Sequence, residues 1–167
     1  MSAERTFNMA FVLDQTKPNQ KYFEAICGIP HPSTEEKAVS DYVCSVAEKL
    51  GLNYEQDKFW NVIVRKPASK GYEDAPVVML EGHMDMVCVK TPESTHDFSH
   101  DPIEIYVDDK GDIRAKDTTL GADDGYGVAY MLAVMEEDFP HPPLELVFTV
   151  QEENLSLIHI SEPTRPR

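Results

Sequence analysis

The chain has 167 residues, which is enough for one domain with a buried hydrophobic core. It carries 15 basic and 30 acidic residues, and this formal net charge of −15 disfavours nucleic acid and anionic membranes as partners. Its three cysteines, Cys27, Cys44 and Cys88, are odd in number and form no Cys-x-x-Cys pair, which fits a reducing, cytoplasmic compartment better than a disulfide framework. The polar start and the strand-length apolar runs indicate neither a signal peptide nor a membrane span.

Two helices are predicted in the first third of the chain. The first covers residues 17–26 and carries a proline in its first turn. The second follows Ser33 and Glu36, whose spacing is typical of a capping box, in which the two side chains bond the free amides of the first helical turn. Apolar residues then recur at helical spacing until Gly51 ends the segment.

The rest of the chain alternates between extended and helical patterns. Strands are predicted at 53–56, 61–65, 77–83 and 144–150, a hairpin joins 103–107 to 113–116, and a helix rich in Ala and Met covers 126–137. No internal repeat, low-complexity tract or linker interrupts residues 1–154. The pattern therefore predicts an α/β fold in which helices flank a mixed sheet.

A histidine and an aspartate stand where the strand from residue 77 should end. In extended backbone, residues two apart point to the same face, so Asp85 can accept the N–H of the His83 imidazole and leave its other nitrogen for a metal. The simpler reading is a strand-end histidine that is hydrogen-bonded to a neighbouring carboxylate. A single His-x-Asp does not decide between the two.

Two further acidic clusters favour the metal reading. Asp123 and Asp124 stand in a glycine-rich turn ahead of a helix, where aspartates also suit the positive end of the helix dipole. Glu152 and Glu153 follow the strand that starts at residue 144, and as neighbours in a strand they should point to opposite sides and do different work. Each cluster alone has an ordinary explanation. Together they match an active site outside the carboxyl edge of an α/β sheet.

These residues carry a family resemblance. The segments Gly-His-Met-Asp-Met-Val (82–87), Gly-Ala-Asp-Asp-Gly (121–125) and Thr-Val-Gln-Glu-Glu (149–153) resemble the successive metal-site motifs of the dinuclear zinc peptidases that include carboxypeptidase G, the aminoacylases and the carnosinases. Within that family, the bacterial aminoacyl-histidine dipeptidases, also called cytosolic non-specific dipeptidases, are the most similar group. Ile-Pro-His-Pro-Ser (29–33) and Thr-Thr-Leu-Gly-Ala-Asp (118–123) add to this resemblance, which covers roughly residues 19–153.

The resemblance implies a role for each site residue. His83 corresponds to the terminal ligand of one metal, Asp123 to the carboxylate that bridges two metals, and Glu153 to the ligand of the second metal. Asp85 then orients His83, and Glu152 corresponds to the general base that takes a proton from the water between the metals. The cofactors would be two divalent ions, most simply zinc, with manganese or cobalt as alternatives. The resemblance also implies a cis peptide bond between Asp123 and Asp124.

The resemblance ends just after Glu153. Residues 155–167 resemble translated sequencing-adapter read-through, so we expect a non-native tail that follows part of a catalytic domain at 1–154. His159 lies in that tail and is not expected to be a ligand. The family pattern also includes a further carboxylate ligand, a second histidine and an inserted lid or dimerisation domain, none of which this sequence contains.

The expected function is hydrolysis of dipeptides, including Xaa-His, by a zinc-activated water in the full-length parent. That parent would be a soluble enzyme that acts on short peptides and forms a homodimer. One alternative is a related di-zinc tripeptidase, aminoacylase or deacylase. The other belongs to a different class: an inactive acidic fragment that binds divalent metal without chemistry.

Overall fold

A computed structural model describes residues 11–154 of the chain. The predicted non-native tail at 155–167 and His159 lie outside the described residues. Nine helices and strands follow in the order α1 (Pro18–Cys27), α2 (Lys37–Lys49), β1 (Asn53–Gln56), β2 (Val62–Lys66), β3 (Val78–His83), β4 (Ile105–Val107), β5 (Ile113–Ala115), α3 (Ala122–Glu136) and β6 (Leu144–Thr149). The predicted α/β fold with a mixed sheet and flanking helices is confirmed.

The main sheet has four strands in the order β1-β2-β6-β3. The β1–β2 and β2–β6 pairs are antiparallel, whereas β3 and β6 run parallel, with His83 opposite Thr149. Parallel neighbours end at the same edge of a sheet. The segments that leave β3 and β6 therefore start side by side.

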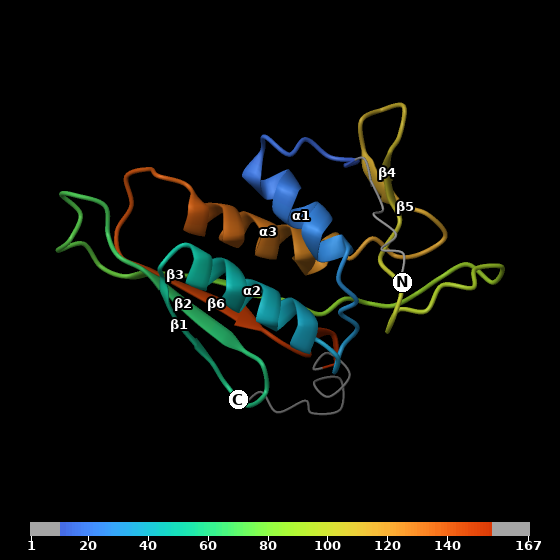
Figure 1. The fold of residues 1–167 in the computed structure, drawn as a ribbon, viewed down its shortest axis with the longest axis horizontal. Coiled ribbons are helices and arrows are strands. Elements are labelled where there is room, and N and C mark those ends of the chain that lie inside the picture. Colours follow the sequence, from blue (N-terminus) through green and yellow to red (C-terminus); the bar gives the residue numbers. More distant parts are fainter. Residues whose placement is uncertain (1–10, 155–167) are drawn as a thin grey trace, which may run out of the picture.

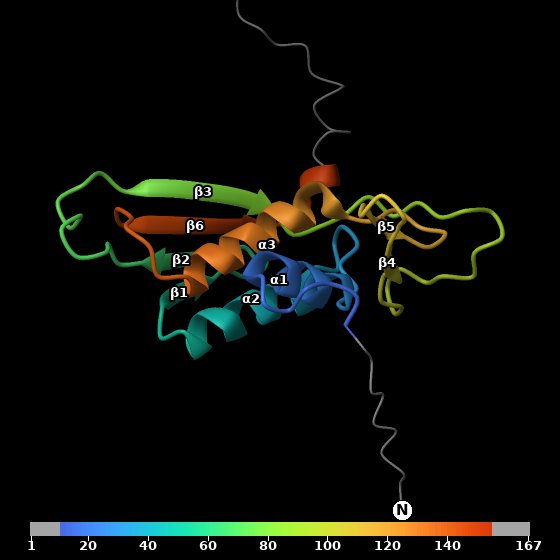
Figure 2. The same cartoon turned by 90° about the horizontal axis from the view of Figure 1, so that it is seen from above.

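The three helices cover one face of this sheet (Figures 1 and 2). Helix α3 packs on β3, α2 packs on β1 and β2, and α1 lies against α3. Strand β6 shows the alternation that a one-sided cover produces, because Leu144, Leu146 and Phe148 are buried and the residues between them are half-buried. The core thus lies between the helices and one face of the sheet.

The predicted hairpin is also present. Strands β4 and β5 pair antiparallel as a separate two-stranded sheet, which projects away from the main sheet (Figure 1). Between residues 11 and 154, no helix combines the length and the apolar character that a membrane crossing requires.

Two local expectations were wrong. Ser33 and Glu36 form no capping box: α2 begins after Glu36 without any side-chain cap, and both side chains bond elsewhere. Glu152 and Glu153 are not neighbours in a strand either, because β6 ends at Thr149 and both residues lie in a short helical turn beyond it. The alternation of faces that holds within a strand does not apply to that turn.

Truncation of a core phenylalanine tests where the core lies. Phe148 is fully buried in β6, so we expect Phe148→Ala to lower the free energy of unfolding by about 3–5 kcal/mol through lost burial and a residual cavity. Phe59, which is 57% exposed, provides the matched control, and Phe59→Ala should change the free energy of unfolding by less than about 1 kcal/mol. Urea unfolding followed by circular dichroism measures both, and equal losses would contradict the placement of the core.

Candidate metal centre

His83 is the last residue of β3 and lies at the centre of the site. Its Nε2 atom is 3.2 Å from Oδ1 of Asp123 and 3.9 Å from Oε2 of Glu152. Its Nδ1 atom faces Asp85, with the backbone carbonyl oxygen at 3.1 Å and the carboxylate Oδ1 at 3.4 Å. A ring that donates from Nδ1 to Asp85 leaves Nε2 directed at the other acidic groups, which is the arrangement that a metal ligand needs.

The acidic surroundings of His83 favour a positive charge on it. Hydrogen bonding to Asp85 raises the pKa of His83 most, burial opposes this, and Asp123 adds to it, so that the pKa rises to about 9. A cation at Nε2 would supply the charge that the proton otherwise supplies.

Asp85 is only 1% exposed and accepts hydrogen bonds from three further groups. The Ser33 hydroxyl donates to its Oδ2 at 2.6 Å, and the backbone amides of Glu152 and Glu153 donate to its two oxygens at 3.0 and 3.1 Å. Burial alone would raise the pKa of Asp85, but the bonds from His83, Ser33 and the two amides outweigh it and lower the pKa to about 2. One buried carboxylate therefore links β3 to the turn after β6.

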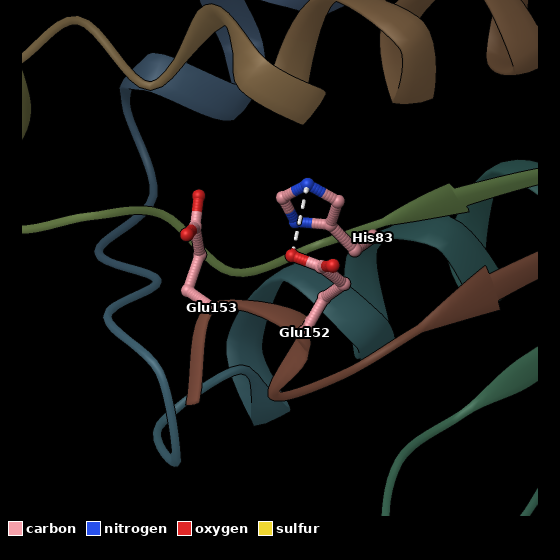
Figure 3. A group of neighbouring side chains, drawn as sticks. All are labelled: His83, Glu152 and Glu153. Atoms are coloured by element: carbon pink, nitrogen blue, oxygen red, sulfur yellow. Dashed lines mark ion pairs between the residues drawn. The ribbon is translucent and has the colours of Figure 1, made fainter. Parts of the chain in front are cut away.

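Glu152 and Glu153 enter the site from that turn. One potential ligand atom from each of His83, Glu152 and Glu153 lies within 4.8 Å of the other two, and no other such group of ligand atoms occurs between residues 11 and 154. Figure 3 shows the three side chains together, with Glu152 paired to His83. Burial and the neighbouring carboxylates, Glu152 first, raise the pKa of Glu153, although His83 opposes them. Mutual repulsion of this kind is what a bound cation relieves.

Asp123 and Asp124 enter from the start of α3. The Asp123 side chain is 92% exposed and reaches His83, and the Asp123–Asp124 peptide is cis, as the family resemblance implied. The carboxylate of Asp124 fills the space beside two glycines, since a Cβ would lie 2.6 Å from its Oδ2 at Gly82 and 2.0 Å from its Oδ1 at Gly127. The sequence analysis assigned no role to Asp124. The glycines at 82 and 127, which leave room for its carboxylate, are the sequence feature that could have indicated one.

Sequence reasoning also missed the groups that hold the turn. Four successive backbone amides, from Val150 to Glu153, each donate to a side-chain oxygen. The acceptors are Asn61 for Val150, Glu36 for Gln151, and Asp85 for the last two. The structure thus brings together all five residues expected from the sequence (His83, Asp85, Asp123, Glu152 and Glu153), and it adds Ser33, Glu36 and Asn61 as their support.

The low pKa of Asp85 predicts a specific dependence of stability on pH. Because its pKa falls from 3.8 to about 2 on folding, ionised Asp85 stabilises the fold fully above about pH 5, and this contribution is lost as the pH falls through the folded pKa. The full contribution is about 2 kcal/mol, and roughly half of it should be gone at pH 3.

The measurement compares the wild-type chain with Asp85→Asn by urea unfolding in EDTA from pH 6 to pH 3. The difference in unfolding free energy should narrow by about 1 kcal/mol over this range. Asp74→Asn, at an exposed loop position, should show no such trend. A difference that stays constant or widens towards pH 3 would contradict the assignment.

No family model matches the chain. Over 144 residues, or 84% of the chain, it is 42% identical to the cytosol non-specific dipeptidase of Escherichia coli (strain K12) and covers 30% of that protein. The crystal structure of aminoacylhistidine dipeptidase from Vibrio alginolyticus matches 87% of the chain with a TM-score of 0.80 and 39% identity, again over 30% of that protein. A tripeptidase structure from Staphylococcus aureus matches 86% of the chain and 38% of its own length, with a TM-score of 0.67 and 24% identity, and supports the fold alone. The chain is therefore similar in sequence and in fold to these two dipeptidases, and it spans about 30% of the length of each.

Proposed function

We propose that residues 11–154 form part of the catalytic domain of a metal-dependent dipeptidase that acts on short peptides, Xaa-His dipeptides among them. The observation that carries the proposal is the convergence of His83, Asp123, Glu152 and Glu153 at the edge where β3 and β6 end. The substrate class is suggested by the two relatives, a cytosol non-specific dipeptidase and an aminoacylhistidine dipeptidase.

The donor atoms at the site fit a divalent metal. One imidazole nitrogen and several carboxylate oxygens are ligands that zinc accepts, and manganese and cobalt accept them as well. His83 would hold one ion, Glu153 a second, and Asp123 would bridge the two. When bound, such ions lower the pKa of water and polarise the carbonyl group that is attacked.

The remaining roles belong to the side chains around these ligands. Asp85 keeps Nδ1 of His83 engaged, so that Nε2 stays directed into the site. The Glu152 carboxylate, which is 53% exposed and next to His83, would take a proton from the attacking water and return it to the leaving amine nitrogen. The peptide bond breaks as the proton reaches that nitrogen.

The described residues supply only part of a two-metal site. Catalytic zinc sites commonly use three protein ligands per ion, and His83, Asp123 and Glu153 are too few for two ions even when Asp123 is shared. We therefore expect the 167-residue chain by itself to bind metal weakly and to hydrolyse dipeptides poorly. This agrees with the alternative of an inactive fragment that binds metal without chemistry. A cytoplasmic location is part of the same proposal and is supported by the similarity to the cytosol non-specific dipeptidase. A homodimeric parent is also part of it and is supported by the family resemblance.

Removal of His83 tests the metal site. We expect His83→Ala to weaken binding of manganese or zinc to the chain more than about tenfold, because His83 supplies the only nitrogen among the ligand atoms grouped at the site within residues 11–154. His100→Ala is the matched control, since His100 is exposed, its ring pairs with Asp97, and neither residue belongs to the group of potential ligands. Isothermal titration calorimetry measures both, and manganese limits competition from the three thiols. Equal affinity in the two variants would count against the site.

Glu152→Gln tests the role of the base. For this experiment, residues 11–154 replace the matching segment of the Escherichia coli dipeptidase, which supplies the rest of the catalytic domain. The chimera should hydrolyse Xaa-His dipeptides, whereas Glu152→Gln should lower kcat at least about 100-fold and leave metal content unchanged. Glu93→Gln, at an exposed loop glutamate, should have no effect.

The same chimera separates the alternatives within the enzyme class. If the chimera turns over tripeptides or N-acetyl amino acids faster than dipeptides, the assignment as a dipeptidase is wrong and a related tripeptidase, aminoacylase or deacylase takes its place. Loss of metal together with activity in Glu152→Gln would make Glu152 a ligand and contradict its role as the base.

A further inference from the structure

The turn that carries Glu152 and Glu153 is held by side chains rather than by a strand partner. After β6 ends at Thr149, the amides from Val150 to Glu153 find no ladder and donate to three side chains instead. Two of those acceptors, Glu36 and Asp85, are buried carboxylates at 0% and 1% exposure. Burial of a carboxylate is costly unless its oxygens accept hydrogen bonds, so these two residues are fixed by what they bind.

Glu36 binds two backbone amides through one oxygen. Its Oε1 accepts the amide of Thr34 and the amide of Gln151, both at 3.0 Å. Both donor residues have left-handed backbone, with φ of 79° at Thr34 and 61° at Gln151. Non-glycine residues adopt this conformation only where the surroundings enforce it, and a β-branched threonine does so rarely. One carboxylate oxygen thus stabilises two unfavourable turns that lie far apart in the sequence.

The turn at 33–36 also reaches the site through its first residue. The Ser33 hydroxyl donates to Asp85, which accepts the amides of Glu152 and Glu153. The segment before α2 therefore contacts the turn after β6 twice, once through Glu36 and once through Ser33 and Asp85. Helix capping does not account for either residue, because α2 has no side-chain cap.

We propose that Glu36 is a positioning residue, which fixes the left-handed backbone of Gln151 and thereby directs Glu152 and Glu153 towards His83. Its effect on metal binding and catalysis rests on the proposed function, whereas its effect on the turn does not. Glu36 acts through the backbone of Gln151 on the two residues that follow it, and it is not among the residues whose potential ligand atoms gather at the site. The Oε2 atom has no hydrogen-bond partner among the described residues, so Oε1 performs this work.

The test uses the 167-residue chain and three substitutions of Glu36. Glu36→Ala removes the acceptor oxygen. Glu36→Asp shortens the side chain by one methylene, so that the charged carboxylate lies further from the two amides. Glu36→Gln keeps an oxygen in place without the charge. Ser40→Ala is the matched control, because Ser40 is equally buried in α2 and its hydroxyl bonds the carbonyl of Trp60 at 2.6 Å and accepts from Gln56. It reports what the loss of a buried hydrogen bond does within α2, the helix that begins directly after Glu36.

The first readout is hydrogen exchange of the amides of residues 151–153 in EDTA, measured by NMR and compared with global stability from urea unfolding. Glu36→Ala and Glu36→Asp should speed exchange at these amides by about tenfold beyond the change in global stability. Glu36→Gln should retain wild-type protection. Ser40→Ala should leave the three amides unchanged relative to global stability.

The second readout is manganese affinity by calorimetry. Glu36→Ala should weaken it by about 10- to 100-fold, as the loss of a group that orients a ligand does, and Glu36→Gln should restore it. If amide exchange at 151–153 is unaltered in Glu36→Ala and Glu36→Asp, or if the glutamine variant resembles the alanine variant, the positioning role is wrong. If those amides respond as expected while the wild-type chain binds no metal, the turn is held as proposed and the metal function fails instead.

Discussion

The buried carboxylate of Asp85 is the constraint on which the candidate site depends. It lies just beyond β3, yet it accepts the amides of Glu152 and Glu153 beyond β6 and the hydroxyl of Ser33 before α2. Because it is desolvated, each unmade bond would cost more than it would in water. Its position therefore fixes the backbone from which the side chains of Glu152 and Glu153 extend. Its contact with Nδ1 of His83 fixes the orientation of that ring.

The glycines near the site have a complementary effect. Gly82 and Gly127 leave room for the Asp124 carboxylate, which a methyl group at either position would displace. Asp124 in turn belongs to the same short turn as Asp123, whose oxygen faces His83. Two buried or half-buried carboxylates, Asp85 and Asp124, thus frame the site, whereas the carboxylates of Asp123 and Glu152, which face His83, stay exposed to solvent.

Sequence periodicity was sufficient for the fold, whereas the candidate site residues were predicted from the motifs at the strand ends and from the family resemblance. The alternation in β6, the helical spacing in α2 and the hairpin of β4 and β5 are local patterns, and each appears in the structure within a few residues of its expected place. The convergence of His83 with Glu152 follows from a parallel pairing of β3 and β6, which the acidic clusters at two strand ends suggested. Local pattern and family resemblance agreed at each of these positions.

The support of the site could not be obtained in the same way. Ser33 and Glu36 have the spacing of a capping box, and nothing local shows that their partners are Asp85 and Gln151, 52 and 115 residues further along the chain. The orientation of Glu152 likewise depends on the left-handed backbone of Gln151, which no propensity predicts for glutamine. Long-range hydrogen bonds overrode the local pattern in both cases.

The parallel pairing of β3 with β6 also affects when the site can form. The two strands are joined through residues 84–143, a segment that includes β4, β5 and α3, so their ends meet only after a long loop has closed. Closure of such loops costs entropy before any contact rewards it, and parallel sheets of this kind are slow to form. If the proposed site binds metal, its affinity should therefore appear late during refolding, in step with β3–β6 pairing and after the helices, and the time course of metal uptake would report on completion of the topology.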